Sequence, residues 1–166
     1  TEVERYRLHE HPEEDPGYEK YLAPLFEALN ERLPSGVEGL DYGSGPHSRL
    51  GRMLMKKGFK VSAYDPYFVP DETTLTREYD FVFAAEVCEH FYRPGVEFQR
   101  LRKLVKRGGV LGLMTQLYDG VTFKDWYYRR EPSHVVFYSK DTLGWIAKNF
   151  GFEHVSVLDK RTAIFS

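Results

Sequence analysis

Glycines and carboxylates stand together at places where a nucleoside could bind. One such place is the turn Asp41-Tyr42-Gly43-Ser44-Gly45-Pro46-His47, which follows a largely apolar run. Gly43 and Gly45 let the backbone turn sharply and approach a ligand with no Cβ in the way. Asp65 follows a second such run, 20 residues after Gly45, where a carboxylate can accept hydrogen bonds from both ribose hydroxyls. The glycines alone equally suit a tight turn with nothing bound, so the hypothesis depends on Asp41 and Asp65.

The charge of this turn indicates which nucleoside fits. A dinucleotide fingerprint requires a third glycine three residues after the second, and Ser48 stands there instead. A carboxylate such as Asp41 is costly at the end of a buried strand unless it serves a partner, and it gains nothing beside a pyrophosphate. A cationic nucleoside is favoured, such as S-adenosylmethionine with its ribose, ammonium and sulfonium. A nicotinamide-linked oxidoreductase is the disfavoured alternative.

Two histidines are the candidate general bases. His90 and His134 fall in segments expected at the carboxyl edge of a sheet, and an unperturbed imidazole titrates near pH 6.5, which suits proton removal at neutral pH. The alternative is structural: His90 would cap local backbone, and His134 would pack among the aromatic residues of 126–138.

No metal site is predicted from the spacing of ligand-type residues. His9, His11, Cys88 and His90 do not form any recognised ligand pair. Cys88 is more typical of a small buried apolar residue than of a nucleophile.

An aromatic group follows the fifth strand of the expected sheet, where an acceptor molecule would enter. It consists of Tyr118, Trp126, Tyr127 and Tyr128. These side chains would form a wall for a planar or apolar substrate, or they are plain core, and the sequence favours neither.

The elements that must position these residues alternate along the chain. The predicted strands are residues 37–42, 59–64, 79–85, 110–115, 152–158 and 162–165, and the predicted helices are residues 15–32, 48–57, 94–107 and 139–150. Only Asp159-Lys160-Arg161 separate the last two strands, which permits only an antiparallel hairpin. The fold class is therefore α/β, a doubly wound, mostly parallel Rossmann-like sheet with an antiparallel last strand. A third strand around Thr73–Thr76 is short or absent.

Composition limits the class of protein. The 166 residues carry 23 basic against 25 acidic side chains, a net charge of −2, so the basic footprint of a nucleic-acid-binding protein is missing. No apolar run approaches the roughly 20 residues that span a bilayer. One cysteine excludes an internal disulfide. We expect a single cytoplasmic domain over residues 1–166, with a lid and helix in 1–34 and an α/β core in 37–166.

The motifs resemble those of a class I S-adenosylmethionine-dependent methyltransferase of the small bacterial methyltransferase-domain type, over nearly the whole chain. The reversed last strand is the topological mark of that family. The segments that carry the resemblance are Gly39–Gly45, Tyr64–Tyr67, Asp80–Val82, Glu86–Phe91, Leu104–Thr115, Trp126–Tyr128, Ser133–Val135 and Phe137–Ser139.

The resemblance implies roles for single residues. Asp41 and the backbone of Gly43, Ser44 and Gly45 would hold the methionine end of the cofactor, and Asp65 the ribose. The adenine would rest on Tyr67, with Pro66 shaping the loop. Glu86 and Val87 would line the methyl-donor channel, and S-adenosylhomocysteine would be the product. Acceptor binding falls to Tyr118, Trp126 and Tyr127.

Two hypotheses about function follow. The first is a methyltransferase that acts on a small-molecule oxygen, nitrogen or carbon. A nucleic-acid base is disfavoured as acceptor because Glu86 stands where base-modifying relatives carry Asn or Asp before Pro-Pro-Tyr or Pro-Pro-Phe. The second is a catalytically silent module that binds S-adenosylmethionine and a partner, motivated by His47 where the family often has a third glycine. The segment Tyr6–His11 would close the site as a lid, with Arg7 pairing to the methionine carboxylate.

Overall fold

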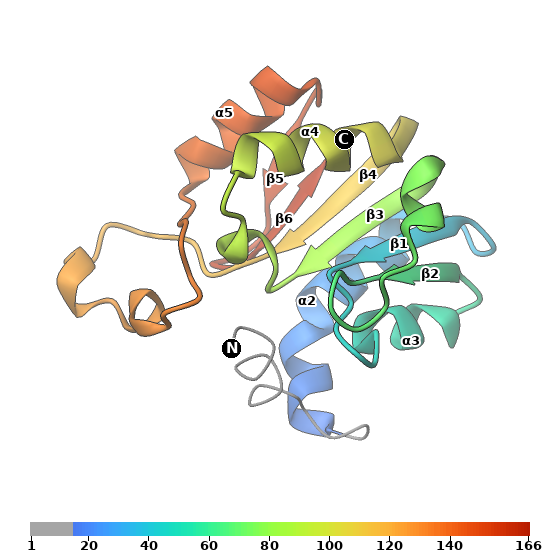
Figure 1. Cartoon of the computed structure of the whole chain (residues 1–166), viewed down its shortest axis with the longest axis horizontal. Helices are drawn as coiled ribbons and strands as arrows, with labels where there is room; N and C mark the ends of the chain where they lie inside the picture. Colours follow the sequence, from blue (N-terminus) through green and yellow to red (C-terminus); the bar gives the residue numbers. More distant parts are fainter. Residues whose placement is uncertain (1–14) are drawn as a thin grey trace.

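A six-stranded sheet forms the centre of the computed structural model, which describes residues 15–166 (Figure 1). The strand order is β2-β1-β3-β4-β6-β5, and β6 runs antiparallel to both of its neighbours. The strands are β1 (Glu38–Tyr42), β2 (Lys60–Tyr64), β3 (Tyr79–Ala85), β4 (Val105–Met114), β5 (Val155–Val157) and β6 (Thr162–Phe165). The predicted fold class is confirmed, including the terminal hairpin.

Helices cover both faces of the sheet, and each face has its own apolar core. On one face lie α2 (Pro16–Arg32) and α3 (Arg49–Met55), and on the other lie α4 (Pro94–Leu104) and α5 (Lys140–Phe150). The chain passes from β2 across β1 to reach β3. The connection after β1, through α3, therefore runs toward β2, whereas the connection after β3, through α4, runs toward β4. Such a switch point leaves a crevice at the carboxyl ends of the strands.

Local capping explains where the predicted helices begin and end. Asp15 accepts a hydrogen bond from Tyr18 N at the start of α2. Ser139 does the same for Thr142 N in α5, which ends at Gly151 with φ +81°. These residues satisfy backbone groups that have no partner within the helix. None of the helices within residues 15–166 is long and apolar enough to cross a membrane.

The boundary between α4 and β4 lies earlier than predicted. The expected helix 94–107 ends at Leu104, and β4 begins at Val105, which is buried and pairs with Tyr79. The pairing then shifts register before Val110. A Cβ on Gly109 would lie 2.6 Å from Asp80 O, so this glycine permits close approach of the two strands rather than terminating the helix.

Around Thr73–Thr76, where a third strand was expected to be short or absent, there is no strand, and a 3₁₀ helix, η1 (Glu72–Thr76), takes its place. Asp71 accepts from Thr73 N, and the Thr74 hydroxyl donates to Asp71 O. Because these groups are satisfied locally, the segment has no need of a neighbouring strand. Strand β2 is consequently at the edge of the sheet.

Candidate functional site

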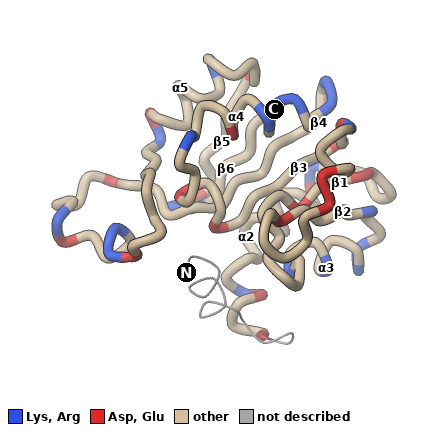
Figure 2. Tube along the Cα trace, in the orientation of Figure 1, with Lys and Arg blue, Asp and Glu red and all other residues tan. Residues whose placement is uncertain are grey.

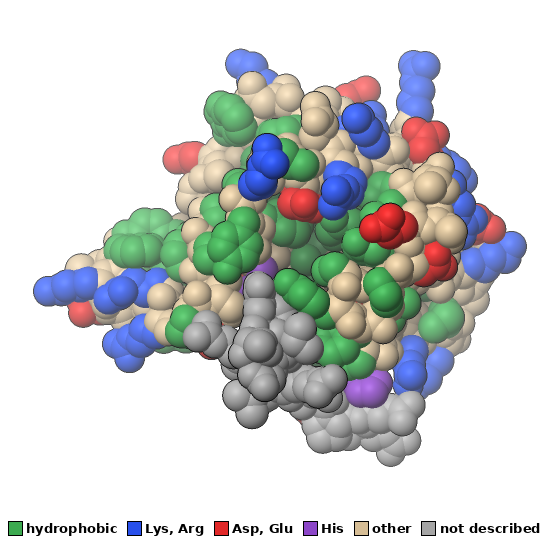
Figure 3. Space-filling view, in the orientation of Figure 1, with side chains coloured by type: hydrophobic (Ala, Val, Ile, Leu, Met, Phe, Trp, Pro, Cys, Tyr) green, Lys and Arg blue, Asp and Glu red, His purple; other side chains and the backbone are tan. Residues whose placement is uncertain are grey.

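A cavity of about 690 Å³ opens at the carboxyl ends of β1, β2 and β3. Figure 3 shows the molecule hollowed in the middle of this face. Its lining contains all of the predicted cofactor residues except Glu86: Asp41, Gly43, Ser44, Gly45, Asp65, Pro66, Tyr67 and Val87. Its volume lies within the range of roughly 300–1,000 Å³ that is typical of small-molecule sites.

The glycine turn is held against the end of β2. Gly43 N and Ser44 N both donate to Tyr64 O, at 2.8 and 3.0 Å. Gly43 has φ +79°, and a Cβ there would lie 2.6 Å from a methyl carbon of Val87. Gly45 has φ +59° and no atom within 4 Å of the place of its missing Cβ. The turn is therefore packed at Gly43 and open toward a ligand at Gly45.

Asp65 connects the two loops that line the cavity. The residue is 7% exposed. Its Oδ2 accepts from Gly45 N at 2.9 Å, and its Oδ1 accepts from Tyr67 N and Phe68 N at 2.9 and 3.1 Å. Two of the four lone pairs of the carboxylate thus accept hydrogen bonds from the loop after β2, and one accepts a hydrogen bond from the glycine turn. Oδ2 keeps one lone pair for a hydroxyl of a ligand.

Asp41 lies buried below the turn and accepts a hydrogen bond from Ser48 Oγ at 2.7 Å. Burial, rather than a charged neighbour, is the main cause that raises its pKa to about 7. Ser48, which stands where a dinucleotide fold has glycine, itself adopts the left-handed conformation, with φ +43°. A cationic ligand close to Asp41 would favour the ionised carboxylate.

Helix α4 contributes a polar wall that sequence reasoning missed. The Tyr42 hydroxyl donates to Glu97 Oε2, and Arg100 donates to the Tyr42 hydroxyl at 3.0 Å and pairs with Glu97 at 3.2 Å. All three residues line the cavity, as does Val96. The signal was present in the sequence, because residues 96, 97 and 100 share one face of a helix whose first residue is Pro94.

Glu86 does not line the cavity. It has φ +55°, and its side chain accepts from the Tyr21 hydroxyl at 2.9 Å and lies 3.2 Å from the Tyr128 hydroxyl. The carboxylate that was expected to face the methyl-donor channel is therefore directed toward α2 and the segment after β4. Its neighbour Val87 occupies the cavity wall instead.

A second polar group lies beside the cavity, around η2 (Cys88–His90). Glu89 is 0% exposed, and its carboxylate accepts a hydrogen bond from the Tyr128 hydroxyl. Burial first, and then the adjacent Glu86, raise the pKa of Glu89 to about 8. The rings of His90 and His134 meet edge to face, with centroids 5.0 Å apart. Of the two candidate bases, His90 lines the cavity and His134 does not.

The predicted acceptor residues Tyr118, Trp126 and Tyr127 do not line this cavity. Trp126 is 6% exposed and packs against Tyr118, with ring centroids 5.4 Å apart. Tyr127 is 65% exposed. The two short 3₁₀ helices η3 (Phe123–Asp125) and η4 (Tyr127–Arg130) direct neighbouring aromatic side chains to opposite sides. Of the two alternatives, Trp126 takes the core position.

The remaining sequence predictions concern Cys88, the N-terminal segment and His47. Cys88 is fully buried, as a small apolar residue would be, and its carbonyl accepts from the Tyr138 hydroxyl. The lid Tyr6–His11, the pairing of Arg7, and His9 lie outside the described residues 15–166. His47 lines the cavity next to the open face of Gly45.

Comparison with known proteins agrees with this geometry. The family model described as "Methyltransferase domain" matches residues 15–157. This chain belongs to the methyltransferase domain family. Its methyl donor is S-adenosylmethionine, and the residues fit that donor: the cavity has the size for a nucleoside, the turn is open at Gly45, and Asp41 and Asp65 offer carboxylates.

Solved structures share the fold of this methyltransferase. The 1,6-didemethyltoxoflavin-N1-methyltransferase of Burkholderia thailandensis, with bound 1,6-didemethyltoxoflavin and S-adenosylhomocysteine, is 13% identical over 87% of this chain and 76% of that chain, with a TM-score of 0.62. An O-methyltransferase family protein of the same organism is 13% identical over 87% of this chain and 55% of that chain, with a TM-score of 0.63.

An N-methyltransferase of Haemonchus contortus, in complex with phosphomonomethylethanolamine and S-adenosylhomocysteine, is 17% identical over 84% of this chain and 38% of that chain, with a TM-score of 0.61. At these identities the likeness concerns the fold. A search of curated proteins found no match.

Proposed function

We propose that this methyltransferase transfers the methyl group to a small-molecule acceptor, and that the cavity holds the cofactor between the glycine turn and η2. The observation that carries the proposal is the convergence of Asp41, Gly45 and Asp65 on one cavity whose lining also contains Val87 and His90. The first three residues suit a nucleoside, and His90 brings an imidazole to the same cavity.

The residues of the chain mainly bind and orient. When bound, S-adenosylmethionine supplies a methyl group that its sulfonium already activates, so alignment accounts for most of the protein's contribution. Asp65 Oδ2 would accept a ribose hydroxyl, and Tyr67 and Phe68 would hold the adenine. Asp41 would offer negative charge to the ammonium of the methionine end. Val87 would line the methyl-donor channel, and His90 would be available to the acceptor.

A small molecule suits the charge distribution better than a nucleic acid does. Lys and Arg occur in separate short stretches over the helices and loops (Figure 2), and the net charge is −2. With basic and acidic side chains nearly balanced, a phosphate backbone gains little net electrostatic attraction. The similar structures from Burkholderia thailandensis and Haemonchus contortus were solved with small molecules, 1,6-didemethyltoxoflavin and phosphomonomethylethanolamine.

Calorimetric titration with S-adenosylmethionine, S-adenosylhomocysteine and NAD tests the cofactor half of the proposal. We expect binding of the first two and none of NAD. Release of S-adenosylhomocysteine is then followed across small molecules, a protein mixture and RNA. Turnover only with protein or RNA would contradict the acceptor class. Tight binding with no turnover on any acceptor would favour the silent module.

A further inference from the structure

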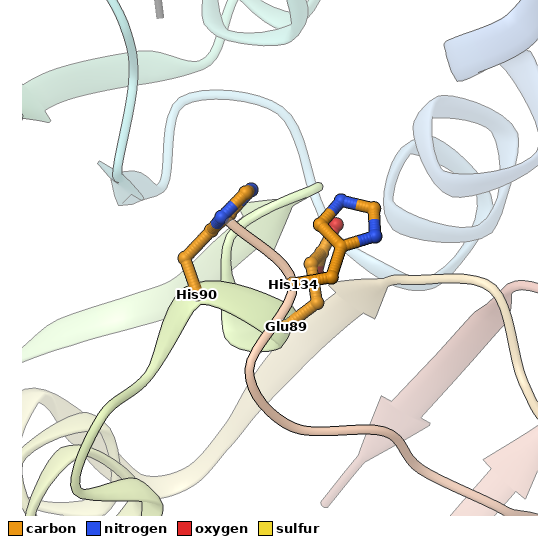
Figure 4. Close-up of side chains that lie close together, drawn as sticks. All are labelled: Glu89, His90 and His134. Carbon is orange, nitrogen blue, oxygen red and sulfur yellow. The ribbon is translucent and has the colours of Figure 1, made fainter. Parts of the chain in front are cut away.

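Three side chains of the types that bind metal ions meet at the wall of the cofactor cavity. Glu89 and His90 come from η2, and His134 comes from the segment after η4 (Figure 4). One ligand atom from each lies within 4.8 Å of the others. Val135 N and Val136 N both donate to Glu89 O, at 2.9 and 3.2 Å. These two backbone bonds fix the segment that carries His134 against η2.

The hydrogen bonds of the two imidazoles fix their tautomers. His90 Nδ1 lies 3.0 Å from Ser133 O, and His134 Nδ1 lies 2.8 Å from Tyr128 O. A carbonyl oxygen only accepts, so each Nδ1 carries the proton, and in the neutral ring Nε2 carries the lone pair. Histidines that ligate metals generally have this arrangement, with the second ring nitrogen donating to a backbone carbonyl or carboxylate.

The neighbouring carboxylates of Glu86 and Glu89 have too few hydrogen-bond donors to stabilise two negative charges. The Tyr128 hydroxyl is within hydrogen-bond distance of both Glu86 Oε2 and Glu89 Oε1, but it has a single proton to donate. Glu86 also accepts a hydrogen bond from the Tyr21 hydroxyl. Glu89 is completely buried. Burying a second carboxylate there is costly unless a cation or a further proton accompanies it.

We propose that Glu89, His90 and His134 bind one divalent transition-metal ion beside the cofactor cavity. Two imidazoles and one carboxylate suit Zn²⁺, Mn²⁺, Co²⁺ or Fe²⁺, whereas Mg²⁺ and Ca²⁺ are generally bound by oxygen alone. Three protein ligands leave coordination positions open, as in catalytic rather than structural sites. Because His90 lines the cavity, an open position faces the end where the acceptor enters.

The site also indicates the kind of acceptor, and this part rests on the proposed function. A metal beside the methyl-donor end would hold an acceptor that offers an oxygen or nitrogen donor atom, and it would lower the pKa of a bound hydroxyl. The two histidines would then be ligands, rather than the general bases that the sequence predicted. An acceptor with no donor atom next to the methylated position would not use the site.

Cobalt binding tests the site independently of methyl transfer. The full chain is treated with a chelator, dialysed and titrated with Co²⁺ alone, and the visible ligand-field absorption and the bound metal per chain are measured. We expect one equivalent, with a spectrum typical of mixed nitrogen and oxygen ligation. His90→Ala, His134→Ala and Glu89→Gln should each weaken Co²⁺ by about 100-fold or more, beyond the roughly 10–100-fold cost of losing an outer partner.

Two control variants separate the site from adventitious binding. His154→Ala and Glu153→Gln change the same residue types at exposed positions, and both should bind Co²⁺ like the wild type. If they weaken Co²⁺ as much as the ligand variants, or if the wild type binds no metal, the proposal is wrong. A melting curve checks that each variant is folded. If a variant does not fold, the wild type still tests the proposal, because bound Co²⁺ should raise its melting temperature.

Titration with S-adenosylhomocysteine in the same samples distinguishes this proposal from the proposed function. Metal-free wild type and His134→Ala should retain S-adenosylhomocysteine binding, since His134 does not line the cavity. Nucleoside binding without metal binding would overturn only the metal site. Metal binding without nucleoside binding would overturn only the proposed cofactor cavity.

Discussion

The carboxyl edge of the sheet holds two groups of carboxylates that are satisfied in different ways. On the glycine-turn side, which consists of Asp41, Gly43, Gly45 and Asp65, the acceptors of Asp65 are filled by backbone N–H groups of the adjacent loops. On the imidazole side, which consists of Glu86, Glu89, His90 and His134, the carboxylates accept from tyrosine hydroxyls of distant segments.

This difference shows how each side is built. Backbone donors are present whatever the side chains are, so the loops around Asp65 need only the correct φ angles and that one carboxylate. Side-chain donors exist only if packing brings them in, so the imidazole side depends on residues far away in the chain. The first should respond to substitutions within its own loops, and the second to substitutions outside them.

The largest expected effect is at Asp65, where a single carboxylate joins the glycine turn to the loop after β2. Asp65→Ala should weaken S-adenosylhomocysteine by about 100-fold or more, or about 2.7 kcal/mol, because it removes the ribose acceptor and leaves three N–H groups without their partner. Calorimetry measures the affinity. Asp71→Asn is the matched control, since Asp71 also accepts a backbone N–H but lies exposed. Equal affinity in Asp65→Ala and wild type would remove the ribose assignment.

Tyr128 provides the corresponding test of the imidazole side. Tyr128→Phe removes the hydroxyl between Glu86 and Glu89 and should destabilise the fold by about 1–3 kcal/mol, the usual cost of an unsatisfied buried polar group. It should also weaken Co²⁺ by roughly 10–100-fold. Urea unfolding and Co²⁺ titration measure the two effects. Tyr127→Phe changes the exposed neighbour and should leave both unchanged; similar effects in both variants would contradict the shared-hydroxyl argument.

The two glycines of the turn should differ in their effects: Gly43 mainly affects the stability of the fold, and Gly45 mainly affects ligand binding. Gly43→Ala should cost about 2–3 kcal/mol of unfolding free energy, because a positive φ disfavours Cβ and the methyl group would press on Val87. Gly45→Ala meets no atom, so it should cost only about 1–2 kcal/mol from its φ while weakening S-adenosylhomocysteine more. Denaturant unfolding and calorimetry on both variants check this, and the reverse order of stabilities would show that packing against Val87 is unimportant.

The smallest expected effect is the pH dependence at Asp41. The ammonium of S-adenosylhomocysteine pairs best with the ionised carboxylate, and the pKa of Asp41 is about 7, so S-adenosylhomocysteine affinity should fall by up to about tenfold per unit as pH decreases below 7. Asp41→Asn should remove that slope, whereas His47 and Asp65, which also face the cavity, remain in place. An unchanged slope in Asp41→Asn would assign the titration to another group.

The protonation of Asp41 should affect protein stability in the opposite direction to its effect on ligand affinity. The folded-state pKa of Asp41, about 7, lies above the ordinary value of 3.8, so the folded protein keeps a proton that the unfolded chain has lost. The contribution of Asp41 to the free energy of unfolding is therefore present below pH 3.8 and disappears as pH rises toward 7. Urea unfolding of wild type and Asp41→Asn across this range measures it.

The sequence predicted those parts of the fold whose partners are close in the chain. Asp15 and Ser139 cap the helices that follow them, and Gly151 ends α5. The four residues between β5 and β6 are too few for a parallel crossover, so the two strands form an antiparallel hairpin. The end of α4 was misplaced because Gly108-Gly109 suggested a helix stop, whereas the glycine conformation serves a strand pairing with β3 that the sequence alone does not show.

The candidate site divides in the same way. The turn from Asp41 to Gly45 and the loop at Asp65 lie next to strand ends, so parallel pairing of β1 and β2 brings them together wherever the rest of the chain lies. Only the tertiary structure decided that Glu86 turns toward Tyr21 and Tyr128, that Trp126 is buried beside an exposed Tyr127, and that His134 meets Glu89 and His90. The segment between β4 and α5 has short 3₁₀ turns and no sustained period, so its contacts are set by packing against η2 rather than by any local pattern of residues.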